Sequence, residues 1–146
     1  MKGDDISGRL VDLAVASLRV AVRLEDSPTG KHIARQMIRS ATGGGSNYEE
    51  ARSAESRADF AHKLGVAAKE VRETSYWLTV IERAGLSPES DLRHLREEAR
   101  QLVAILTASA RTAKRASRPA RAQARPNSGF PVSISVPVSH SGAVDP

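Results

Sequence analysis

Four long segments carry apolar residues at intervals of three and four, and short stretches rich in Gly, Pro or Ser separate them. This spacing places the apolar side chains on one face of an α-helix, and it constrains the fold more than any other feature of the chain. The segments cover about residues 4–24, 31–54, 56–84 and 88–115. The sequence therefore predicts an all-α protein, an antiparallel up-down four-helix bundle over residues 1–115.

Cap and turn residues predict where these helices begin and end. Residues 26–30 are expected to terminate the first helix, because a proline within them cannot continue it. Either Ser53 or Ser56 is expected to cap the third helix, and Gly85 is expected to end it. Ser87 is expected to cap the fourth helix, with Pro88 at its first position.

Three consecutive glycines, Gly43, Gly44 and Gly45, interrupt the second segment. Each costs about 1 kcal/mol relative to alanine inside a helix. The segment is therefore expected to form either one kinked helix or two short ones. The glycines favour a hinge or a close approach between helices, and the alternative is an anion-binding nest that opens a helix.

The first and fourth segments carry more apolar residues than one core face needs. A second stripe in the first segment consists of Val11, Val15, Leu18 and Val22. Beside the main seam of the fourth segment lie Val103 and Ile105. Surplus apolar surface of this kind predicts burial between subunits, and hence a homo-oligomer.

Positive charge is concentrated near the C-terminus. Residues 1–98 carry 15 basic and 16 acidic side chains, whereas residues 99–146 carry seven basic and one acidic. Residues 116–146 are predicted to be a disordered tail, first basic and then rich in Pro and Ser. The candidate nucleic-acid-binding residues are Arg111, Lys114, Arg115, Arg118, Arg121 and Arg125. Such a tail is either an arm that contacts phosphates or a solvated segment that aids solubility.

A second group of polar residues is expected to be structural. It consists of Arg39, Asn47, Glu50, Glu70 and Glu73. If the second and third helices are antiparallel, Arg39 lies opposite about position 71, within reach of Glu70 or Glu73, and Asn47 lies within reach of Lys63. Partly buried pairs of this kind fix helix register, and the alternative is a set of ordinary exposed charges.

Several classes of chemistry find no support in the sequence. Without cysteine there is no thiolate metal site and no Cys nucleophile, and neither a Gly-x-Ser-x-Gly motif nor a phosphate-binding Walker loop occurs. His62 and His94 each follow an aspartate by three residues, but in an antiparallel pair of helices they stand roughly 24 Å apart. A shared two-metal site needs about 4 Å. We therefore expect no enzymatic activity, metal, cofactor or small-molecule substrate.

The chain also lacks the features of a membrane or exported protein. No apolar run reaches the roughly 18 residues of a membrane span, and the first residues are acidic rather than typical of a signal peptide. A cytoplasmic location without membrane contact is expected.

Three stretches, residues 39–51, 59–64 and 69–78, together resemble the four-helix-bundle family of 23S rRNA intervening-sequence proteins. The resemblance covers about residues 8–112 and lies in the order and spacing of Arg39-Ser40-Ala41, Asn47, Asp59-Phe60 and Tyr76-Trp77-Leu78. The chain departs from the family pattern at Gly43 and Gly44, where Ser and Ile are usual.

The resemblance implies an up-down bundle that assembles into homo-oligomeric rings, with pentamers favoured, and no enzymatic activity. Members are encoded in intervening sequences of large-subunit rRNA genes, and a distant branch accompanies the reverse transcriptase and RNA of diversity-generating retroelements. We therefore expect a non-enzymatic oligomeric scaffold that contacts RNA or a nucleic-acid-processing protein. The alternative is a protein-interaction module without a nucleic-acid role.

Overall fold

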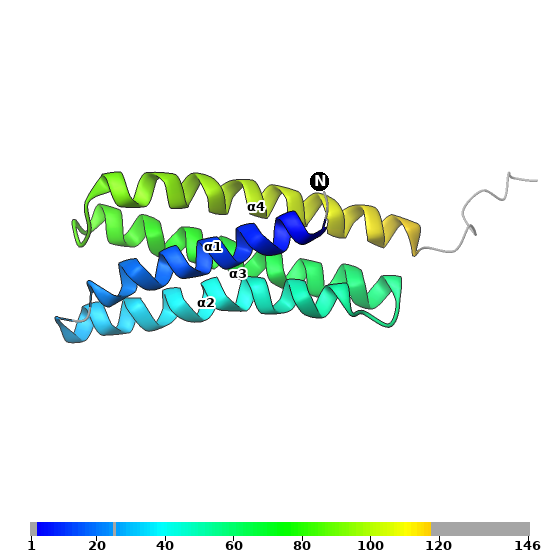
Figure 1. The fold of residues 1–146 in the computed structure, drawn as a ribbon, viewed down its shortest axis with the longest axis horizontal. Helices are drawn as coiled ribbons and strands as arrows, with labels where there is room; N and C mark the ends of the chain where they lie inside the picture. Colours follow the sequence, from blue (N-terminus) through cyan, green and yellow to red (C-terminus); the bar gives the residue numbers. More distant parts are fainter. Residues whose placement is uncertain (1–2, 25, 118–146) are drawn as a thin grey trace, which may run out of the picture.

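The computed structural model describes residues 3–24 and 26–117, which form four α-helices joined by short connections (Figure 1). The helices are α1 (Gly3–Val22), α2 (Pro28–Arg52), α3 (Arg57–Arg83) and α4 (Glu89–Ala116). Helix α1 packs on α2 and α4, α2 packs on α3, and α3 packs on α4. Consecutive helices run in opposite directions, which confirms the predicted antiparallel up-down bundle.

The core lies along the axis shared by the four helices. Each helix contributes side chains three and four positions apart, as the apolar spacing predicts. The largest fully buried apolar side chains are Leu10, Leu13, Val20, Met37, Leu64, Val71, Leu78, Ile81, Leu92, Leu102 and Leu106. Val103 and Ile105 are partly buried against this core. They therefore contribute to the packing of the single bundle as well as to its surface.

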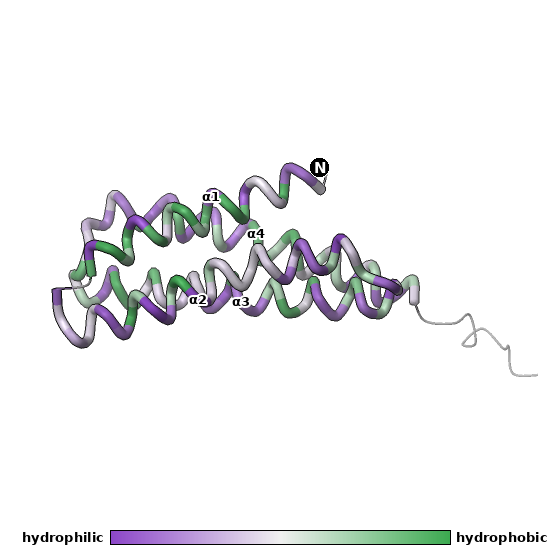
Figure 2. The backbone as a smooth tube through the Cα atoms, turned by 60° about the horizontal axis from the view of Figure 1, so that its bottom comes forward, coloured by the Kyte–Doolittle hydropathy of each residue, from purple (hydrophilic) through white to green (hydrophobic). Residues whose placement is uncertain are grey.

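Helix α1 is shorter than its neighbours and does not run the full length of the bundle. It begins short of the end where α2 joins α3 and where α4 terminates (Figures 1 and 2). At that end only α2, α3 and α4 lie side by side among the described residues. The last turns of α4 consequently have an uncovered side.

The start of α2 differs from the prediction, because the helix begins at Pro28 rather than near Lys31. The hydroxyl of Ser27 accepts a hydrogen bond from the backbone N–H of Gly30 at 3.0 Å. Proline suits the first helical position, because a backbone N–H at that position would have no partner within the helix. Pro28 therefore initiates α2. The first helix does end before residues 26–30, as predicted, but the predicted start of the second helix near Lys31 was wrong.

Helix α2 is continuous through its three glycines, which settles the choice between one helix and two. A Cβ atom on Gly44 would stand 2.6 Å from Cγ2 of the buried Val71 in α3. The glycines thus permit a close approach of two helices. Because their backbone N–H groups lie inside a helix, the alternative of an anion-binding nest is wrong.

The connection from α3 to α4 confirms one predicted signal and contradicts another. Gly85 has a φ of +65°, and the backbone N–H of Leu86 bonds to the carbonyl of Ile81 at 3.0 Å, which closes α3 as predicted. Pro88, not Ser87, occupies the N-cap position of α4. The hydroxyl of Ser87 is buried and has no hydrogen-bond partner within the described residues. Ser87 therefore does not cap the helix.

Helix α4 ends at Ala116, one residue beyond the predicted boundary of the bundle. The predicted disordered tail lies almost entirely outside the described residues, which end at Ser117. None of the helices described here is long and apolar enough to span a membrane.

Candidate nucleic-acid interface

The C-terminal part of α4 presents a basic surface. Between residues 99 and 117 this part of the chain contains no acidic side chain. Arg111, Lys114 and Arg115 are exposed there, and none of them forms an ion pair with another described residue. The other three predicted contacts, Arg118, Arg121 and Arg125, lie outside the described residues.

Two of these cations line a groove between α3 and α4. The groove has a volume of about 260 Å³. Small side chains from both helices line it, namely Ala61, Gly65, Ala68, Thr107 and Ala110. Lys69 and Arg72 lie on the α3 side, opposite Arg111 and Lys114 of α4. Four cations and five small residues therefore line the same groove.

Sequence reasoning missed Lys69, Arg72 and the neighbouring His62. His62 lines an adjoining hollow together with Lys114. A signal for these residues was available, because His62, Lys69 and Arg72 share one helical face while the core positions Leu64 and Val71 share the other. The charge count of the bundle, which is close to neutral, concealed this one-sided arrangement.

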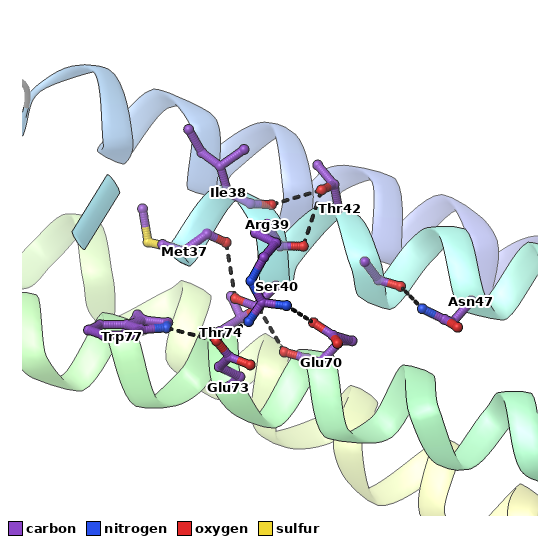
Figure 3. A network of polar contacts seen from close by, with 11 residues as sticks. Met37, Ile38, Arg39, Ser40, Thr42, Asn47, Glu70, Glu73, Thr74 and Trp77 are labelled. Carbon is purple, nitrogen blue, oxygen red and sulfur yellow. Dashed lines mark hydrogen bonds and ion pairs between the residues drawn. The ribbon is translucent and has the colours of Figure 1, made fainter. Parts of the chain in front are cut away.

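The predicted structural set is centred on Arg39, which reaches from α2 to two carboxylates of α3 (Figure 3). Its Nη1 lies 3.4 Å from Oε2 of Glu70, and its Nη2 donates a short hydrogen bond to Glu73. The indole N–H of Trp77 also donates to Glu73, at 3.3 Å. The hydrogen bond from Arg39, aided by that from Trp77, holds the pKa of Glu73 below its ordinary value despite partial desolvation.

Beneath this pair lies a buried polar contact that the sequence did not indicate. The hydroxyls of Ser40 and Thr74 are 3.0 Å apart, and both residues are fully buried. Ser40 also donates to the carbonyl of Met37 at 3.1 Å. Because each hydroxyl has a partner, the contact fixes the register of α2 on α3 without leaving an unpaired buried group (Figure 3).

Asn47 does not make the contact that was expected of it. The side-chain amide of Asn47 donates to the carbonyl of Gly43 at 2.8 Å, within its own helix, rather than reaching Lys63. Lys63 lies instead 3.8 Å from a carboxylate oxygen of Glu50 and 3.6 Å from one of Asp59. Asn47 therefore bonds to a backbone carbonyl of its own helix, at a position where Gly43 has no side chain to cover that carbonyl.

Within residues 3–24 and 26–117, no group of three or more His, Asp or Glu side chains is arranged to hold a metal ion. The carboxylates that do come together, Glu70 and Glu73, are engaged by Arg39. These carboxylates thus hold α2 on α3, whereas Arg111, Lys114 and Arg115 at the end of α4 form no ion pair with another described residue.

Comparisons with known proteins agree with this architecture. The sequence pattern that defines the family of 23S rRNA-intervening sequence proteins matches residues 7–108. A solved structure from Bacteroides thetaiotaomicron, described as a protein of unknown function from the S23 ribosomal protein family, is 28% identical in sequence. Its likeness covers 70% of this chain and 95% of that one, with a TM-score of 0.66. A search of curated proteins finds no match. With the family pattern matched over most of its length and all four helices in place, the chain belongs to the 23S rRNA-intervening sequence proteins.

Proposed function

We propose that this protein is a non-enzymatic, homo-oligomeric helical scaffold that binds RNA through the basic end of α4. The observation that carries the proposal is the unpaired cationic surface formed by Arg111, Lys114 and Arg115, in a segment without acidic side chains. Surface cations that lack protein partners are available to phosphate oxygens, and phosphate contacts supply most of the affinity of non-specific RNA binding. The family description associates its members with 23S rRNA, which makes RNA the first partner to test.

Residues 118–125 extend the same charge pattern in the sequence, with Arg118, Arg121 and Arg125. In the sequence they follow the exposed cations of α4. Six cations with no acidic residue between them would bind RNA with little sequence preference and a strong dependence on salt. If several copies present this segment together, a weak contact in each copy becomes a strong one overall.

Oligomerisation is supported by the second apolar stripe of α1. Val11 and Val22 are 56% and 69% exposed, and Val15 and Leu18 between them are each more than a third exposed. The four residues follow one another at intervals of four, three and four, which is the spacing of a helix–helix seam. A second copy of this chain offers the same stripe, so the two are complementary. Pentamers are favoured by the family resemblance.

We propose no catalytic activity, because the carboxylates that come together pair with arginines of neighbouring helices. Glu70 and Glu73 form ion pairs with Arg39, and Glu98 forms one with Arg9 at 2.6 Å.

The exposed stripe of α1 also suits the second candidate function, a protein-interaction module without RNA. In that case α1 would bind a different protein, and the cations of α4 would only solubilise the chain.

Binding of generic RNA to the full chain at about 50 and 200 mM salt tests the proposal. Six phosphate contacts predict a loss of affinity of about 2.5 to 3 orders of magnitude over that range. Arg111→Ala with Lys114→Ala should weaken binding and reduce the salt dependence. The matched control is Lys31→Ala with Arg35→Ala, which removes the same charge from exposed positions of α2.

Equal losses in the two double variants would show that only net charge matters and would contradict a site on α4. If the unaltered chain does not bind RNA at about 50 mM salt, the proposed RNA-binding function is wrong and the interaction-module function is favoured.

A further inference from the structure

The outer face of α3 combines cations with an exposed aromatic ring. His62, Lys69, Arg72 and Tyr76 follow one another at intervals of seven, three and four, so they lie on one side of the helix. The core residues of α3, such as Val71 and Leu78, lie on the opposite side. Tyr76 is 60% exposed, which is unusual for a side chain of its size.

The four acidic residues of α3 contact other cations. Asp59 lies near Lys63, and Glu82 pairs with Arg96 of α4. Glu70 and Glu73 lie toward α2, where both contact Arg39. Across the groove, α4 carries Arg111 and Lys114 and no acidic residue beyond position 98. The groove between α3 and α4 therefore has cations on both walls and a floor of small side chains, which lets a sugar–phosphate backbone approach closely.

Tyr76 lies on the same face of α3, one turn beyond Arg72, and its ring is positioned by a neighbour. Its ring meets that of Trp77 edge to face, with centroids 5.1 Å apart and planes at 71°. Trp77 is in turn held by His32, with ring centroids 6.4 Å apart, and by its hydrogen bond to Glu73. The surrounding contacts thus orient the tyrosine while most of it remains open to solvent.

We propose that the α3–α4 groove binds a single-stranded segment of RNA, with its phosphates on Lys69, Arg72, Arg111 and Lys114 and a base stacked on Tyr76. This inference rests on the proposed function and names the form of RNA and the residues that recognise it. A cationic groove that follows the backbone, together with an aromatic ring for the bases, is the combination by which proteins bind single strands. Bases inside a duplex already stack on one another and have no free face for Tyr76.

Fluorescence anisotropy of the full chain with a labelled oligouridine of about 12 nucleotides tests the inference. Tyr76→Leu keeps an apolar side chain but loses the aromatic face, and should weaken binding about tenfold. Tyr76→Phe keeps that face and should bind within about twofold of the unaltered chain. Circular dichroism checks that both exposed substitutions leave the helices intact.

The cations of α3 are tested in parallel. Lys69→Ala with Arg72→Ala should lower the slope of log affinity against log salt by about 1.4, the value for two phosphate contacts on a single strand. The control is again Lys31→Ala with Arg35→Ala. A blunt-ended RNA duplex should bind more weakly than the oligouridine and should be insensitive to the Tyr76 substitutions.

The outcomes separate this inference from the proposed function. If the unaltered chain binds no RNA, both fail. If RNA binding depends on Arg111 and Lys114 but is unchanged in the Tyr76→Leu chain and in the α3 double variant, the groove assignment alone is wrong. Equal affinity for the blunt-ended duplex and the oligouridine would also overturn it.

Discussion

Val71 of α3 occupies the space that a side chain on Gly44 of α2 would need. A Cβ atom on Gly44 would lie 2.6 Å from Cγ2 of Val71, which is itself fully buried and β-branched. Because the χ1 angle of a valine is restricted, its side chain cannot move aside without a cost in free energy. The close contact between α2 and α3, and the register of Arg39 on its carboxylates, therefore depend on a glycine at position 44.

The first prediction concerns this contact. Gly44→Ala should lower the free energy of unfolding by about 1–2 kcal/mol, since the cost of overpacking exceeds the gain in helix propensity. Gly8→Ala is the matched control, because nothing lies within 4 Å of a Cβ at that position of α1, and it should raise stability by about 0.5–1 kcal/mol. Urea unfolding of both variants measures the difference. A stabilised Gly44→Ala chain would show that the two helices need no close approach.

The second prediction concerns the ion pair of Arg39 and Glu73. The side chains are 54% and 34% exposed, so a double-mutant cycle with Arg39→Ala and Glu73→Gln should give a coupling of about 0.5–1 kcal/mol. Additive effects of the two substitutions would mean that the charges act independently.

The same pair predicts a pH dependence. The hydrogen bond from Arg39 lowers the pKa of folded Glu73, so the stabilisation is present above the ordinary pKa of a glutamate and is lost as pH falls through the lowered value. The difference in unfolding free energy between the unaltered chain and Glu73→Gln should therefore shrink as the pH falls from about 7 to about 3. A constant difference across this range would contradict the assignment.

The third prediction concerns the helix caps. Ser27→Ala and Ser56→Ala should each cost about 1 kcal/mol, because their hydroxyls accept hydrogen bonds from the backbone N–H groups of Gly30 and Asp59. Ser87→Ala should cost nothing or stabilise the chain slightly, because its buried hydroxyl has no partner among the described residues. Thermal unfolding compares the three variants, and a destabilised Ser87→Ala chain would assign this serine a capping role after all.

The fourth prediction concerns the exposed stripe of α1. Val15→Glu with Leu18→Glu should dissociate the homo-oligomer, because it places charges in an apolar seam between copies. Leu86→Glu is the control, since Leu86 is comparably exposed (41%) but lies outside the stripe. Sedimentation velocity distinguishes the species. A stripe variant that keeps the mass of the unaltered chain would show that α1 is not the contact between copies.

Much of the fold could be predicted because its signals are local. Apolar spacing identified all four helices, and Gly85 ended α3 where its positive φ requires a residue without a side chain. The start of α4 was misplaced by one residue, because Pro88 rather than Ser87 occupies the N-cap position. The start of α2 was misjudged because a proline can end one helix or begin the next. Sequence alone does not tell which of these a given proline does.

The site was harder to predict because its parts come from different helices. An antiparallel register sufficed to bring Arg39 to Glu70 and Glu73, since α2 and α3 are consecutive and joined by a short turn. The groove needed the rotation of α3 about its own axis, which sets Lys69 and Arg72 beside Arg111. That rotation follows from packing against two neighbours at once, so charge along the chain does not reveal it.

The central claim is that copies of this chain assemble and present a basic RNA-binding surface. Light scattering of the full chain at micromolar concentration, with and without RNA, tests it most directly. The account predicts a mass that is a multiple of 15.7 kDa, a further gain on addition of RNA, and a return to the RNA-free mass after nuclease treatment. A stable species of 15.7 kDa whose mass does not change with RNA would contradict it.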